Sequence, residues 1–238
     1  MLGIKIVHCS QRDLTLIVAN ICFTNSRCYV AQRRMAIAVD EYSSKPKALP
    51  IQVEWKPFMI DPGTKKEGEE YIAYNRRRWG GDGWTQSLRR DGRKFGANFA
   101  DWKWWPNTLK AHQMVAYFAR RQGGGGQDTT SRSNQALFEA LYEEGQNLSS
   151  VDTLVNVAVE KLGLPKEEQE DLRQFLEHDK AASEVLREIE EGRQQYRISG
   201  VPFFVIGRDP RKAGERPYGF SGAQKPSTFL EIFEELEG

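Results

Sequence analysis

Residues 20–35 read NICFTNSRCYVAQRRM, and this stretch decides how the chain begins to fold. From Cys28 onward, apolar and polar residues mix with the spacing of a helix, which we expect to end before the proline-punctuated loop SSKPKALP. A C-x-x-C motif at a helix start is the usual dithiol of a redox protein, but the residue three positions before Cys28 is Asn25. The stretch therefore has the form of a redox motif whose first sulfur is missing.

A strand is predicted on either side of this helix. Residues 4–8, IKIVH, alternate and are rich in β-branched side chains, and residues 51–60, IQVEWKPFMI, alternate in the same way. Strand, helix and strand in this order predict a parallel pair joined by a right-handed crossover. Residues 8–27 fit neither a helical nor a strand period, and they include the apolar run LTLIVANICF. That run is too short to span a bilayer, and no cleavage site of a secretory signal follows it.

The rest of the chain predicts helices first and strands only at the end. Seven helical stretches are expected between residues 61 and 197, interrupted by the flexible sequence GGGG at 123–126. Strands return at residues 201–206 (VPFFVI) and 218–222 (YGFSG), and residues 227–236 form a closing helix. We therefore expect one α/β domain, built from residues 1–60 and 198–238 and interrupted by a helical insertion at 61–197. A long insertion is tolerated because the entropy of closing a loop grows slowly with its length.

Composition narrows the functional class. The 238 residues can bury a core without disulfides, and the three cysteines, Cys9, Cys22 and Cys28, all lie in the first thirty residues, which favours a reducing, cytoplasmic setting. Lysine plus arginine (34) nearly balances aspartate plus glutamate (33), so we expect neither nucleic acid nor a membrane as a partner. His8, His112 and His178 are scattered, no Cys/His spacing suits zinc, and no metal site is predicted.

Several segments together resemble the DsbA-like thioredoxin-fold family, in particular its FrnE-type members and their relatives, 2-hydroxychromene-2-carboxylate isomerase and kappa-class glutathione transferases. They occur in family order: CYVAQRRM, PNTLKAHQMVAYF, ALFEALYEEGQNLSS, GVPFFVI and YGFSGAQKPSTF. The resemblance implies a thioredoxin-like α/β fold with a large all-helical insertion. It also implies that Pro202 is the cis-proline that faces the redox motif, with Val201 before it.

The family's activity implies a thiol-disulfide oxidoreductase that acts on a protein or small-molecule thiol. Cys28 matches the resolving cysteine, whereas Asn25 stands at the position of the attacking cysteine, so the activity is expected to be impaired. We expect a substrate to lie between the start of the Cys28 helix and Val201-Pro202. The residues expected to contact it are Val201, Pro202, Tyr29, Ser26 and His112, the last from a helix of the insertion.

Three explanations for the missing cysteine remain open. Cys22 could pair with Cys28 if the intervening loop folds back. Alternatively, disulfide chemistry has been lost, and the chain is a glutathione-dependent isomerase or transferase, or a non-catalytic binding protein; glutathione would then be a co-substrate or ligand and no other cofactor is implied. The third hypothesis is that residues 8–27 are intron-derived or mispredicted sequence that replaces the first cysteine.

Overall fold

A four-stranded mixed sheet lies at the centre of the computed structural model, which describes residues 14–121, 127–194, 197–212 and 214–237. The strand order is β2-β1-β5-β6; β1 pairs parallel with β2 and antiparallel with β5, and β5 pairs antiparallel with β6. The strands are β1 (Leu14–Ile21), β2 (Ile51–Pro57), β5 (Phe203–Asp209) and β6 (Tyr218–Ser221). This confirms the thioredoxin-like fold. The strand expected at residues 51–60 is β2, and it pairs parallel with β1.

The position of β1 corrects the sequence analysis. The strand predicted at residues 4–8 lies outside the described residues, and the first strand of the sheet comes from the run LTLIVANI, whose sequence has no strand period. β1 is an inner strand, and Thr15, Ile17 and Ala19 are 0% exposed. An inner strand with apolar residues on both faces reads as a continuous apolar run rather than an alternation.

The same finding bears on the hypothesis that residues 8–27 are foreign sequence. Residues 14–27 supply the inner strand of the sheet, the turn after it and the first residues of α1 (Ser26–Ser43). Residues 14–27 are thus part of the folded domain, whereas the hypothesis concerns the transcript and stays a prediction that sequencing of the messenger tests. Residues 8–13 lie outside the described part of the chain.

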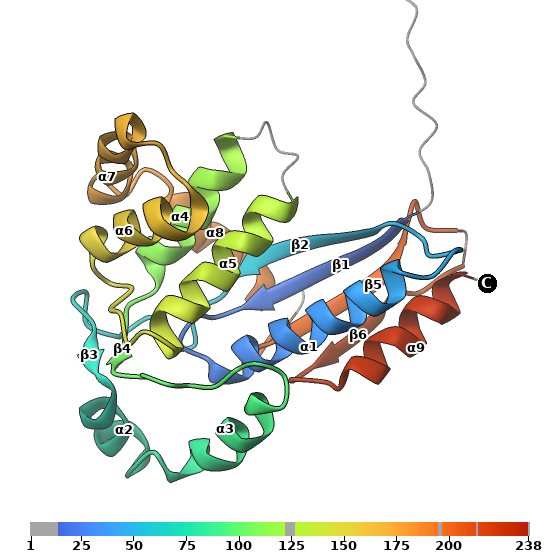
Figure 1. Cartoon of the computed structure of the whole chain (residues 1–238), viewed down its shortest axis with the longest axis horizontal. Helices are drawn as coiled ribbons and strands as arrows, with labels where there is room; N and C mark the ends of the chain where they lie inside the picture. Colours follow the sequence, from blue (N-terminus) through green and yellow to red (C-terminus); the bar gives the residue numbers. More distant parts are fainter. Residues whose placement is uncertain (1–13, 122–126, 195–196, 213, 238) are drawn as a thin grey trace, which may run out of the picture.

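Helices cover both faces of the sheet. α1 and α9 (Pro226–Glu237) lie side by side on one face (Figure 1), where Phe204 of β5 meets Phe229 of α9 with ring centroids 5.2 Å apart. α8 (Ala182–Gln194) packs on the opposite side, where Glu188 pairs with Lys56 of β2 at 3.7 Å. This burial of apolar residues on the α1/α9 side stabilises the sheet and fixes the direction of α1.

The segment between β2 and α8 is helical apart from one short ladder. Tyr29, Phe138 and Tyr142 stack within its core, so α1 and the insertion share one hydrophobic cluster. The expectation of no strand in this segment is wrong only for the two-residue strands β3 and β4, which pair antiparallel. In chain order the elements are β3 (Glu69–Glu70), α2 (Tyr71–Trp79), a 3₁₀ helix (Gly83–Thr85), α3 (Gln86–Arg93), β4 (Trp104–Trp105), α4 (Leu109–Arg121), α5 (Gln127–Tyr142), α6 (Val151–Leu162), a second 3₁₀ helix (Lys166–Glu168) and α7 (Gln169–Glu177).

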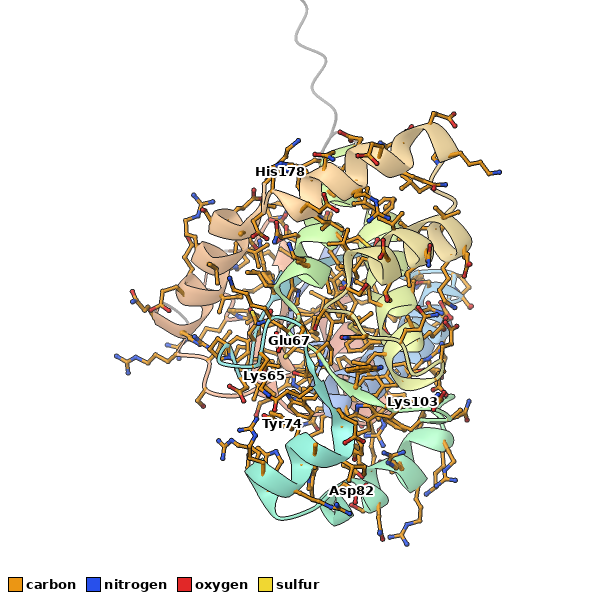
Figure 2. The ribbon with its side chains drawn as sticks, turned by 90° about the vertical axis from the view of Figure 1, so that its left-hand side faces the viewer. Lys65, Glu67, Tyr74, Asp82, Lys103 and His178 are labelled. Carbon is orange, nitrogen blue, oxygen red and sulfur yellow. The ribbon has the colours of Figure 1, made fainter. Side chains whose placement is uncertain are left out.

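The insertion extends to both ends of the view in Figure 2. α2 and α3 lie at the bottom around Asp82, and α7 lies at the top, where it ends at His178. Among the described residues, no helix combines the length and the apolar composition needed to cross a membrane.

Candidate functional site

The turn between β1 and α1 places Asn25 against the residue before Pro202. Asn25 is the N-cap of α1, and its Oδ1 accepts a hydrogen bond from the backbone N–H of Arg27 at 3.0 Å. Its Nδ2 donates to the backbone carbonyl of Val201, which lies 176 residues further along the chain. The Val201–Pro202 peptide bond is cis. The asparagine amide thus joins the start of α1 to the loop before β5, the two segments that the family resemblance predicts to face each other.

Ser26 lies beside this junction as an unsatisfied hydroxyl. Its side chain is 0% exposed, and its Oγ has no hydrogen-bond partner among the described residues. A buried hydroxyl without a partner costs on the order of 1–3 kcal/mol, so its position at a helix start calls for an explanation. The first N–H groups of a helix favour an electron-rich atom, and Ser26 adds an O–H donor to them.

The two described cysteines lie below this surface. Cys22 and Cys28 are free thiols, 1% and 0% exposed, and the backbone N–H of Cys22 donates to Sγ of Cys28 at 3.4 Å. Burial raises the pKa of both thiols, that of Cys28 well above its ordinary value. Both sulfurs are therefore poor nucleophiles in this arrangement, because disulfide exchange needs an accessible thiolate.

Tyr29 points away from the junction into the insertion. Its side chain is 0% exposed, its ring stacks on Tyr142 with centroids 5.4 Å apart, and its hydroxyl donates to Oε1 of Glu143 at 2.8 Å. Burial raises the pKa of Tyr29, which keeps the phenol protonated. The side chain of Tyr29 is thus a packing and hydrogen-bonding group in the core. It exposes no atom that could contact a substrate, contrary to the expectation from the sequence.

Glu143 is the structural residue that sequence reasoning missed. Its carboxylate accepts the backbone N–H groups of Asn98, Phe99 and Ala100 at 2.8–3.2 Å, in addition to the hydroxyl of Tyr29. This holds residues 98–100 against α1 from more than forty positions away in sequence. No local pattern around Glu143 signals the contact, since its partners are mainly backbone groups.

His112 lies behind the site rather than at it. It is buried in α4, where its Nε2 lies 3.2 Å from the carbonyl oxygen of Phe58. Its ring packs on that of Phe23, with ring centroids 4.6 Å apart. Burial lowers its pKa to about 4, so the imidazole is neutral near pH 7. In the described ranges no group of three His, Cys, Asp or Glu side chains could hold a metal ion.

Comparisons with known proteins agree with this fold. A family model described as DSBA-like thioredoxin domain matches residues 26–234. A probable DsbA oxidoreductase from Streptomyces coelicolor superposes with a TM-score of 0.70 and 21% identity, over 93% of this chain and 89% of that one. 2-Hydroxychromene-2-carboxylate isomerase superposes with a TM-score of 0.60 and 13% identity, over 93% and 95%. The cytosolic disulfide reductase DsbM from Pseudomonas aeruginosa, solved with GSH, superposes with a TM-score of 0.60 and 13% identity, over 92% of this chain and 98% of that one. No curated protein matches the chain.

Proposed function

The chain belongs to the DsbA-like thioredoxin family, and from this premise we propose that it binds a small thiol of the glutathione type at the start of α1 without exchanging disulfides itself. The observation that carries the proposal is the residue that faces Val201. It is Asn25, an amide that cannot form a mixed disulfide, while Cys22 and Cys28 are buried thiols.

The groups around Asn25 suit a sulfur ligand that is electron-rich. The helix start favours a thiolate, because the helix dipole stabilises the deprotonated form. The unpartnered Oγ of Ser26 is buried, so it would donate to the ligand only after binding opens the turn around it. The amide of Asn25 would exchange its bond to Val201 for one to the ligand, which would free the Val201 carbonyl for the ligand backbone. The structure of DsbM with GSH supports this class of ligand, because that protein shares the fold.

Calorimetric titration with reduced glutathione tests the proposal. We expect binding by the unaltered chain and about three- to tenfold weaker binding by Asn25→Ala and Ser26→Ala, since each loses one hydrogen bond. Ser44→Ala is the matched control: Ser44 caps the other end of the same helix, through its bond to Asp40, and its loss should leave binding unchanged. Equal affinities of the unaltered chain and Asn25→Ala would reject the site.

A second candidate function rests on one specific contact. The 3.4 Å approach of the Cys22 N–H to Sγ of Cys28 places the two cysteines together, as a dithiol pair requires. Such a pair would give two electrons and two protons to a substrate disulfide and become a disulfide itself.

Insulin reduction separates the two functions. We expect the turnover of the unaltered chain to equal that of Cys28→Ser. A higher turnover that depends on Cys28 would establish the oxidoreductase function and overturn the binding proposal. We also propose a reducing, cytoplasmic setting, which the free state of both described cysteines supports.

A further inference from the structure

The outer edge of β2 carries backbone groups without partners. β2 is an end strand of the sheet. The Pro50 carbonyl, just before β2, accepts from the N–H of Thr15 in β1, and the Phe58 N–H, just after β2, donates to the carbonyl of Ile21 in β1. In a parallel pair alternate residues face the neighbour, so the N–H and C=O groups of Val53 and Trp55 face away from β1. Within the described ranges these outward groups make no hydrogen bond. A free edge of this kind is a template for another strand.

This edge opens into a cavity of about 560 Å³. Ligand pockets usually have volumes of about 300–1,000 Å³, so the cavity has the size of a binding site. Figure 1 shows α4 and α5 beside β2 and α8 behind them, and all three helices contribute walls. The apolar part of the lining includes Val53, Trp55, Val115, Ala116, Ala119 and Val185.

One buried donor in the wall lacks an acceptor. Asn134 of α5 is 1% exposed and lines the cavity, and its Nδ2 has no partner in the part of the chain that the structure describes. Its neighbour in space, Ser131, is satisfied, because it accepts a hydrogen bond from Trp55 Nε1 at 2.8 Å. An unpaired buried amide is costly, and a carbonyl of a bound molecule would satisfy it.

The charges at the rim leave a negative surplus. Lys56 pairs with Glu188 at 3.7 Å, and Arg120 pairs with Glu184. Glu54, which also lines the cavity, has no ion pair among the described residues. A basic group on an occupant would complement this carboxylate.

We propose that this cavity binds a short extended peptide with a basic side chain, which adds to β2 as a further strand. The alternating N–H and C=O groups of the edge match a peptide backbone, Asn134 matches one of its carbonyls, and Glu54 matches its basic residue. Residues of α4, α5 and α8 line the cavity around this edge, and we therefore take a single strand as its occupant rather than a second copy of the chain. The cavity contains none of the residues of the Asn25 site, so the inference is independent of the proposed thiol ligand.

Titration with blocked pentapeptides tests the inference. The probe is acetyl-Val-Lys-Val-Ala-Val-amide, called the lysine peptide. The control is the same peptide with glutamine in place of lysine, called the glutamine peptide. We expect the lysine peptide to bind and to slow hydrogen exchange of the Val53 and Trp55 amides. Two further peptides carry N-methyl groups on alternate backbone nitrogens, one on the odd-numbered and one on the even-numbered residues. One of the two methylation patterns should abolish binding and the other leave it intact, because only every second peptide N–H faces β2.

Three variants locate the site. Asn134→Leu should weaken binding about three- to tenfold, whereas Gln135→Leu, at the exposed neighbouring position of α5, should not. Ala119→Trp should fill the cavity and weaken binding about tenfold or more. Glu54→Gln changes only a half-buried side chain and keeps the fold; it should weaken the lysine peptide and leave the glutamine peptide unchanged.

Four results would overturn the inference. The first two are the absence of binding at millimolar peptide concentration and equal binding of the two N-methylated peptides. The other two are a dimer of the chain that Ala119→Trp dissociates, and peptide binding only after residues 1–13 are removed. The last two would assign the edge to a second copy or to the chain's own amino-terminal segment.

Discussion

Replacing Asn25 by cysteine should restore the chemistry that the site lacks. Asn25 is the N-cap of α1, where the Arg27 N–H now donates to its side chain at 3.0 Å and the hydroxyl of Ser26 has no partner. A thiolate in that place would accept from both groups and interact favourably with the helix dipole. Cys28 lies three residues further along the same helix start, a spacing at which Cβ atoms are about 5–6 Å apart. A disulfide needs only a small adjustment from this separation.

The expected effect follows from the thiol pKa. An ordinary cysteine has a pKa of about 8.5 and is about 3% thiolate at pH 7, whereas thiols at helix starts have values of about 3.5–7.5. With a pKa at or below about 7, at least about half of the introduced thiol would be ionised, an increase of about fifteenfold or more. Losing the asparagine cap should cost about 1 kcal/mol of the free energy of unfolding.

The assay combines absorbance at 240 nm against pH with insulin reduction by dithiothreitol. Asn25→Cys should show a low thiol pKa, an internal disulfide with Cys28 and turnover above that of the unaltered chain. Asn25→Ser controls for the change of cap, and Asn25→Cys combined with Cys28→Ser should form mixed disulfides without turnover. A thiol pKa of about 8.5 or above in Asn25→Cys would refute the reasoning, since it would mean that the start of α1 does not stabilise a thiolate.

Three further outcomes are expected. The buried His112 has a pKa of about 4 in the folded chain, against about 6.5 in the unfolded chain. Its contribution to the free energy of unfolding is therefore complete above pH 6.5, and it is lost as the pH falls towards 4 because the unfolded chain takes up the proton first. Urea unfolding at pH 7 and 4.5 should show a loss of about 2 kcal/mol that is absent in His112→Phe; an equal loss in both would contradict it. Cys22 and Cys28 should react with iodoacetamide about a hundredfold more slowly in the native than in the unfolded chain, and equal rates by mass spectrometry would mean that the thiols are accessible. Glu143→Gln should lower the free energy of unfolding by about 2 kcal/mol, because a charged acceptor of three backbone N–H groups is lost; Glu144→Gln, at the exposed next position, should change it by less than about 0.5 kcal/mol.

Much of the fold could be predicted from local patterns. The helix after Cys28, the strand at 51–57 and the closing β-β-α unit each have a period or a turn signal of their own, and the structure places them within a few residues of the prediction. β1 escaped prediction because an inner strand is apolar on both faces and lacks alternation. The identity of Asn25 was also readable from the sequence, since the C-x-x-C spacing fixes where the first sulfur should be.

The sequence by itself determined the chemistry available at the site: an amide at residue 25, a serine after it and a thiol at residue 28. Only the tertiary structure decided what these groups contact. It joined Asn25 to Val201 across 176 residues, buried both cysteines, and turned Tyr29 towards Glu143. It also left the edge of β2 facing three helices from the insertion. The reason is physical: periodicity reports how each segment lies between core and solvent, whereas the contacts between segments depend on how the whole chain packs.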